Sequence, residues 1–239
     1  MITNCNTPTS DSNLRNDAQD PSMHKDRVQT AIIEKGVFAR ENLQKHQLGH
    51  TDLNILFVAY KDLDRLELFA KFKNQEHYIP IQHYKICARS GALGPKKAEG
   101  DKQVPEGFYH IDRFNPKSKF YLSLGLDYPN PYDLAHNYTG SDIFIHGKCE
   151  TVGCLPMTDD IMKEIYLYAL WAKDSSQQKI PVYIFPFEMT EENMFTYKEQ
   201  VNDQTFSFWQ NIQEGYQLFQ STKKELEFKV VQNKYRFIY

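Results

Sequence analysis

The segment from Ile145 to Met157 concentrates the side chains best suited to covalent chemistry. It holds a histidine and two cysteines within nine positions (His146, Cys149 and Cys154), directly after a strand-like apolar run. A glycine, Gly153, stands before the second cysteine. A cysteine nucleophile needs an imidazole to take its proton and a flexible backbone that turns N–H groups toward a developing oxyanion. The segment therefore predicts an acyl-transfer site with Cys154 as nucleophile and His146 as general base.

The same three side chains are also zinc-type ligands, so a zinc-stabilised interaction domain is an alternative. A structural zinc site takes four ligands, usually in paired short spacings. The sequence offers no second pair, and we expect neither a metal nor a cofactor. Asp159 and Asp160 follow Thr158 and are expected to begin a helix rather than to act as catalytic acids.

Charge and hydropathy exclude two classes of function. The chain has 28 basic and 31 acidic residues, for a net charge of −3, which argues against nucleic acid as a partner. A small cluster of Lys96, Lys97 and Lys102 is either a solvated loop or a site for substrate carboxylates. No apolar run reaches the roughly 18 residues that a membrane span requires.

Composition and cysteine placement raise two questions about the chain outside the site. Residues 1–23 are polar and are predicted to be a disordered tether, in which Cys5 invites a lipid anchor. Cys87 and Cys149 lie beside strands that would meet near the site. They are expected either to pair, if the protein is exported, or to remain two buried thiols. The mechanism requires only that Cys154 stays free.

The order of elements predicts a β-rich α+β fold, either a sandwich or a half-open barrel. An accessory helix is expected within residues 24–50, a catalytic domain over 51–188, and helices with a hairpin over 189–239. Expected strands cover 53–60, 66–72, 78–87, 108–111, 120–124, 142–145 and 181–185. Helices are expected from Thr158 to about Lys173, after Thr190, and over 204–220, with the hairpin turning at 232–234. Residues 88–107 and 127–141 are expected to be loops. The aromatic cluster of Phe206, Phe208 and Trp209 is expected to pack in the core rather than to stack on a sugar.

Several motifs in order resemble the L,D-transpeptidase (YkuD-type) catalytic domain, over roughly residues 53 to 220. The resemblance is to a Gram-negative subgroup that includes an enzyme releasing lipoprotein from peptidoglycan. It rests on His146-Gly147 with Gly153-Cys154, and on these further stretches: 90–97, 99–101, 104–109, 128–130, 132–133, 135–136, 139–141, 186–187, 189–194 and 208–211.

The resemblance implies a role for each site residue. The Gly147 carbonyl would orient the His146 ring, and the backbone N–H groups of Gly153 and Cys154 would receive the oxyanion. Lys96, His136, Ser141 and Thr151 are the candidate substrate contacts. The substrate implied is a peptidoglycan stem peptide, attacked at meso-diaminopimelate, by a monomeric enzyme in the periplasm or cell envelope.

One departure from the family pattern leaves the outcome of the reaction open. Many members have a second histidine before the cysteine and a polar residue two positions after it, whereas this chain has Val152 and Pro156 there. Transfer to an amine, forming a cross-link or tether, and hydrolysis that detaches a murein-bound lipoprotein are therefore equal expectations. A scaffold that binds murein without turnover is the non-enzymatic alternative.

Overall fold

The computed structural model describes residues 21–238, so the predicted tether and Cys5 lie outside the described residues, apart from positions 21–23. Residues 21–23 begin a helix, α1, which spans Pro21–Lys45. The helix predicted for residues 24–47 is therefore confirmed, with a start three residues earlier. No helix among the described residues is long and apolar enough to cross a membrane.

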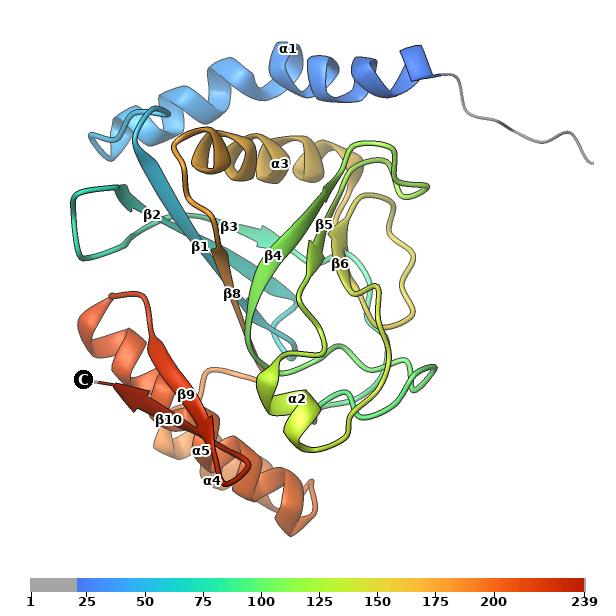
Figure 1. Cartoon of the computed structure of the whole chain (residues 1–239), viewed down its shortest axis with the longest axis vertical. Coiled ribbons are helices and arrows are strands. Elements are labelled where there is room, and N and C mark those ends of the chain that lie inside the picture. Colours follow the sequence, from blue (N-terminus) through green and yellow to red (C-terminus); the bar gives the residue numbers. More distant parts are fainter. Residues whose placement is uncertain (1–20, 239) are drawn as a thin grey trace, which may run out of the picture.

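A single curled sheet of eight strands forms the centre of the molecule (Figure 1). The strands lie in the order β3-β2-β1-β8-β4-β5-β6-β7. Their bounds are β1 Leu53–Tyr60, β2 Arg65–Phe72, β3 Ile79–Lys85, β4 Gly107–Asn115, β5 Ser123–Leu126, β6 Phe144–His146, β7 Leu155–Pro156 and β8 Ile180–Phe185. Neighbours are antiparallel except for β1 with β8 and β6 with β7. The predicted α+β class is confirmed, in its half-open barrel form.

The two faces of the sheet are covered by different layers, as the alternation along β1 shows. Ile55 and Phe57 belong to a core shared with α1 and with α3, which spans Asp159–Asp174. Leu56 and Val58 point the other way, into a second core shared with the C-terminal elements. Because successive side chains of a strand point to opposite faces, β1 is apolar at every position except Asn54 and is buried on both sides.

The C-terminal layer consists of two helices and a hairpin, which Figure 1 shows together on one side of the sheet. Their bounds are α4 Glu191–Lys198, α5 Asp203–Thr222, β9 Glu227–Val231 and β10 Lys234–Ile238. Gln232 and Asn233 both have positive φ at the predicted turn, which suits the tight turn of a two-residue hairpin. Phe208 and Trp209 are buried in the second core, as the core interpretation predicted.

Two short elements were not predicted. Residues 127–141 contain a helix, α2 (Pro131–Ala135), which begins with a capping box between Asn130 and Asp133. The strand β7 has only two residues and pairs with β6. Both are too short for a periodic pattern, so only their local capping and pairing bonds define them.

Candidate active site

Parallel pairing of β6 with β7 places His146 and Cys154 on one face of the sheet. Ile145 pairs with Leu155 and His146 with Pro156, and extending the register by one residue sets Cys154 opposite Phe144. Because side chains alternate along a strand, this register directs the side chains of Phe144, His146, Cys154 and Pro156 to the same face of the sheet. Of the two predicted catalytic residues, His146 thus ends β6 and Cys154 directly precedes β7, the strand that pairs with β6.

The imidazole of His146 is buried and held in one orientation. Its Nδ1 lies 2.6 Å from the Gly147 carbonyl oxygen, an acceptor, so Nδ1 carries the proton and Nε2 keeps its lone pair. The Phe120 ring packs against the imidazole, with 4.6 Å between ring centroids. Burial lowers the pKa of His146, and the hydrogen bond to Gly147 only partly opposes this. The resting imidazole is therefore neutral, as a general base must be.

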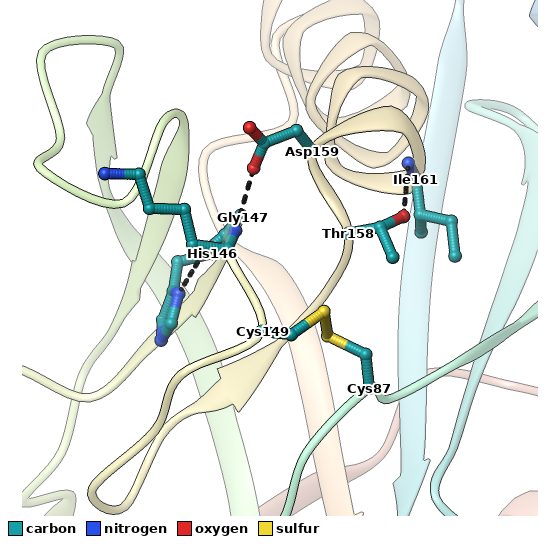
Figure 2. The surroundings of a disulfide bond; sticks show 8 residues. Cys87, His146, Gly147, Cys149, Thr158, Asp159 and Ile161 are labelled. Atoms are coloured by element: carbon teal, nitrogen blue, oxygen red, sulfur yellow. Dashed lines mark hydrogen bonds between the residues drawn. A yellow bond between two sulfur atoms is a disulfide. The ribbon is translucent and has the colours of Figure 1, made fainter.

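Gly147 and Asp159 fix the turn that follows His146 (Figure 2). A Cβ at Gly147 would stand 2.7 Å from Asp159 Oδ1 and 2.9 Å from the Phe120 carbonyl oxygen, so a larger residue would force the turn apart. Asp159 Oδ1 accepts the Lys148 N–H at 2.8 Å. Asp159 is thus the first residue of α3 and a support for the turn, while Thr158 caps the helix as predicted.

Cys87 and Cys149 form a disulfide, with their Cα atoms 5.5 Å apart (Figure 2). The bond joins the segment after β3 to the turn between His146 and Cys154. The Cys87 N–H also donates to the Pro156 carbonyl at 3.0 Å. Of the two expectations for these cysteines, the structure has the pair, and Cys149 is therefore not available as a metal ligand. Among residues 21–238, Cys154 is the free cysteine.

The thiol of Cys154 is half-buried beside the start of β6. Its Sγ lies 3.6 Å from the Asp142 carbonyl oxygen. Burial raises the pKa of the Cys154 thiol, the Phe144 backbone lowers it, the Asp142 carboxylate raises it and Lys96 lowers it. A raised thiol pKa beside a lowered imidazole pKa favours a neutral thiol and a neutral base at rest. Proton transfer must then accompany attack.

Both backbone N–H groups predicted to hold the oxyanion donate to side-chain hydroxyls in the structure. The Gly153 N–H donates to Ser90 Oγ at 2.7 Å, and the Cys154 N–H donates to Thr151 Oγ1 at 2.9 Å. Thr151 Oγ1 in turn donates to the Cys154 carbonyl. The side chain of Thr151, which was predicted as a substrate contact, thus closes the turn by hydrogen bonds to the Cys154 backbone. Gly153 has φ +106°, a conformation that favours glycine.

Cys154 opens into a cavity of about 170 Å³. Its lining also includes Ile86, the segment from Ala88 to Leu93, and Lys61, Asp64, Val104 and Leu155. Arg89, half-exposed in this lining, donates to Asp64. Ser90 and Arg89 line this cavity, although neither was predicted from the sequence as a site residue and only the stretch 90–97 contributed to the family resemblance.

A buried polar network holds the wall of this cavity in place. Lys61 Nζ donates to Glu106 Oε1 at 2.8 Å and to the Gly94 and Val104 carbonyls. Glu106 is fully buried and accepts the Gly94 N–H at Oε1 and the Trp209 indole N–H at Oε2, the latter at 2.8 Å. The network therefore ties β1 and the loop before β4 to α5, and every charge in it has a partner.

The other three candidate substrate contacts lie in different surroundings. Lys96 is buried and donates to Asp101 and to the Ala98 carbonyl, and its role as a substrate contact stays a prediction. Ser141 is exposed and donates to Asp142, next to the carbonyl that faces Cys154. His136 lines a second cavity and not the one containing Cys154.

Comparisons with known proteins agree on the family. A model of the YkuD L,D-transpeptidase catalytic domain matches residues 58–184. The chain is also 37% identical over 183 residues to the protein named "Putative L,D-transpeptidase YafK" from Escherichia coli strain K12, covering 76% of this chain and 72% of that one. The chain belongs to the YkuD L,D-transpeptidase family. The match is the same for the protein of that name from E. coli O157:H7.

Solved structures offer more distant likenesses to this YkuD-family protein. One is the helical cell shape determining protein Pgp2 from Campylobacter jejuni, at 19% identity and a TM-score of 0.46, covering 74% of this chain and 73% of that one. Another is Bd1075 from Bdellovibrio bacteriovorus, at 23% identity and a TM-score of 0.42, covering 70% and 62%. Family membership itself identifies a cell-wall enzyme family, whose members act on peptidoglycan in the cell envelope.

Proposed function

We propose that this protein is a periplasmic cysteine acyltransferase or hydrolase that forms an acyl-enzyme on Cys154. The acyl group is the carbonyl of a meso-diaminopimelate residue in a peptidoglycan stem. The observation that carries the proposal is the division of the described cysteines. Two are consumed in a disulfide that braces the turn, while the third is free, half-buried in a cavity and on the same sheet face as an oriented imidazole.

The chemistry follows from the protonation states at rest. His146 Nε2 takes the thiol proton as sulfur attacks the carbonyl carbon, and a tetrahedral intermediate forms. Its C–N bond then breaks, and the imidazolium returns the proton to the leaving amine, which leaves a thioester on Cys154. An amine or a water molecule attacks this thioester, with His146 again accepting a proton, and the free thiol is restored.

The oxyanion requires donors that the resting site has already engaged. The Gly153 N–H is bound by Ser90 Oγ, and within residues 21–238 the Ser90 hydroxyl proton has no acceptor. The substrate oxygen therefore either displaces the hydroxyl and bonds Gly153 directly or bonds the hydroxyl proton. In both cases Ser90 stands at the oxyanion position, and it lines the same cavity as Cys154.

Intact-protein mass spectrometry after treatment with a carbapenem or iodoacetamide tests the nucleophile. In a Cys5→Ser background, which removes the cysteine outside the described residues, one adduct on Cys154 is expected in the native protein and none after the further change Cys154→Ala. The Cys87–Cys149 disulfide leaves no second free thiol in residues 21–238. An unmodified Cys154 in the folded protein would favour the murein-binding scaffold instead.

Purified sacculi, with and without bound lipoprotein, distinguish the acceptors. Wild type is expected to change the muropeptide profile and Cys154→Ala is not. New cross-links or tethers indicate transfer, whereas released lipoprotein or shortened stems indicate hydrolysis. The buried, apolar Leu155 and Pro156 after the cysteine provide no polar side chain for an acceptor amine, which favours hydrolysis as the second candidate function. Profile changes that persist in Cys154→Ala would refute the mechanism.

A further inference from the structure

The loop between β4 and β5, residues 116–122, covers one face of the His146 imidazole. The Phe120 ring of this loop packs on the imidazole, with 4.6 Å between ring centroids. Phe120 is itself 40% exposed, whereas His146 is only 2% exposed. The phenyl ring therefore lies between the imidazole and solvent, and it contributes to the burial that lowers the pKa of His146.

The backbone of the same loop packs against the turn that follows His146. The Gly147 N–H donates to the Leu122 carbonyl oxygen at 3.1 Å. A Cβ at Gly147 would stand 2.9 Å from both the Phe120 carbonyl oxygen and the Tyr121 Cβ. Because atoms this closely packed cannot shift independently, a displacement of the loop has to disturb the turn as well.

Arg27 on α1 binds this loop from 91 and 94 positions away in the sequence. Its Nη1 donates to the Ser118 and Tyr121 carbonyl oxygens, each at 2.7 Å, and the guanidinium carbon lies 5.6 Å from the centroid of the Tyr121 ring. The two accepting carbonyls stand on either side of Phe120 in the sequence. One nitrogen atom therefore fixes the backbone before and after the residue that covers the imidazole.

Other contacts hold α1 on the molecule independently of Arg27. Ala31 and Leu43 are completely buried in the core that α1 shares with the sheet. Lys35 pairs with Asp160 at 2.5 Å, on the helix α3 beside which α1 lies (Figure 1). Loss of the Arg27 bonds should therefore release the loop while the helix stays docked.

We propose that Arg27 is a positioning residue for the general base, acting through Phe120 on the imidazole of His146. The inference rests on the proposed function, in which His146 accepts the thiol proton. Without the two Arg27 bonds the loop moves away from the imidazole, water reaches the ring, and the ring loses a packing contact. Arg27 lies outside the residues 58–184 that the family model matches, so the accessory helix takes part in the site from beyond the catalytic domain.

The pKa of His146 in the Cys154→Ala protein tests the proposal without any turnover. It is followed by the ¹H NMR signal of the imidazole Cε1–H, which is assigned by its loss in His146→Gln. Arg27→Met keeps an apolar side chain and removes both hydrogen bonds. Because hydration favours the charged imidazolium, the pKa of His146 should rise toward its ordinary 6.5. Arg27→Lys retains a donor nitrogen and should raise the pKa less. Arg40→Ala, at a half-buried arginine of the same helix, should leave the pKa unchanged.

A double-variant cycle with Phe120→Ala distinguishes positioning from a general loss of stability. Phe120→Ala alone should also raise the pKa of His146. Adding Arg27→Met should then change the pKa no further, because the two side chains act through one contact. An unchanged pKa in Arg27→Met or in Phe120→Ala, or shifts that add in the double variant, would overturn the proposal, whatever the change in Tm.

Turnover of stem peptides by proteins that retain Cys154 provides the kinetic counterpart. Arg27→Met should lower kcat/KM roughly tenfold, since small displacements of a catalytic group have effects of this order or larger. The acidic limb of its pH profile should move toward pH 6.5 with the pKa of His146. Adduct formation on Cys154 is measured separately. An unshifted His146 signal therefore refutes the role of Arg27 and leaves the proposed function standing, whereas a missing adduct refutes the proposed function alone.

Discussion

At the scale of single residues, burial shifts the pKa values of the two proposed catalytic groups in opposite directions. Burial lowers the pKa of His146 from its ordinary 6.5 and raises the pKa of Cys154 above its ordinary 9.0. Between these values the base is neutral and the thiol is protonated. In the proposed mechanism the reactive form is therefore the neutral thiol–imidazole pair. The imidazole removes the thiol proton only as the bond from sulfur to substrate forms.

A pH profile of kcat/KM tests this assignment. Because the folded-state pKa of His146 lies below 6.5, His146 takes up a proton only at a pH below 6.5. The acidic limb of the profile should therefore lie below pH 6.5. His146→Gln should remove that limb and lower the rate by about 10²–10⁴-fold. His83→Gln, an exposed histidine on β3, is the control. An acidic limb above pH 6.5 in the wild type would contradict a buried neutral base.

Ser90 is the residue for which structure adds most to sequence. Ser90→Ala removes the hydroxyl that binds the Gly153 N–H and should lower kcat by roughly ten- to a hundredfold, at or below the usual effect of one oxyanion donor. KM should change little. Ser90→Thr keeps the hydroxyl and should retain most of the rate. Equal losses in both variants would show that the hydroxyl is not what matters.

At the scale of elements, helices and strands with a periodic sequence pattern could be predicted. Elements that depend on a capping bond or on pairing with another strand could not. β1, β8 and α3 carry their own signals, namely a long apolar run or a capping threonine before an amphipathic stretch. α2 and β7 have five and two residues, so their existence depends on Asn130 capping and on pairing with β6. Cys154 and His146 could be proposed as nucleophile and base from the sequence because they share one short segment.

The parts of the site that sequence missed come from remote segments. Ser90 meets Gly153 across 63 positions. The ion pair between Lys96 and the half-buried Asp101 cannot be recognised from spacing alone. Local pattern carries no information on which loop will close over a cavity. Family resemblance drew attention to residues 90–97 but could not say which of their side chains would face Cys154.

The disulfide is an element-scale constraint that can be measured. Its two cysteines are separated by 62 positions, and closing a loop of that length should stabilise the fold by about 4 kcal/mol in the chain-entropy view. Denaturant unfolding of Cys87→Ala/Cys149→Ala should show this loss, and turnover should fall because the turn after His146 loses its tether. Cys154→Ala, which keeps the disulfide, should unfold like the wild type. Equal stability of both proteins would contradict a bracing role.

At the scale of the whole molecule, the C-terminal layer supports the site although the family match ends at residue 184. Trp209 on α5 donates to Glu106, which with Lys61 holds the loop that lines the cavity. The Tyr235 hydroxyl accepts a bond from Asn130, the residue that caps α2. Residues 189–239, which were predicted to pack on the catalytic domain, thus make hydrogen bonds to Glu106 and Asn130 of residues 51–188.

The chain's two tryptophans provide a matched test of this connection. Trp209→Phe keeps a buried ring but leaves Glu106 Oε2 without its donor, which should lower the unfolding free energy by about 1–3 kcal/mol beyond the packing change. Turnover should fall as the cavity wall loosens. Trp171→Phe, whose indole N–H has no hydrogen-bond partner among residues 21–238, should have a smaller effect. Similar losses in both variants would mean that the indole–carboxylate bond contributes little.

The closeness of Cys149 and Cys154 in the chain creates a hazard during maturation. Within residues 21–238 three sulfur atoms compete for one bond, and a newly made chain that joins Cys87 or Cys149 to Cys154 would be inert although otherwise oxidised. Refolding in air should therefore yield a silent fraction that peptide mapping identifies and that a thiol–disulfide shuffling buffer or an isomerase reactivates. Recovery of full activity from this protein thus depends on sulfur connectivity being sorted before the chain locks into shape.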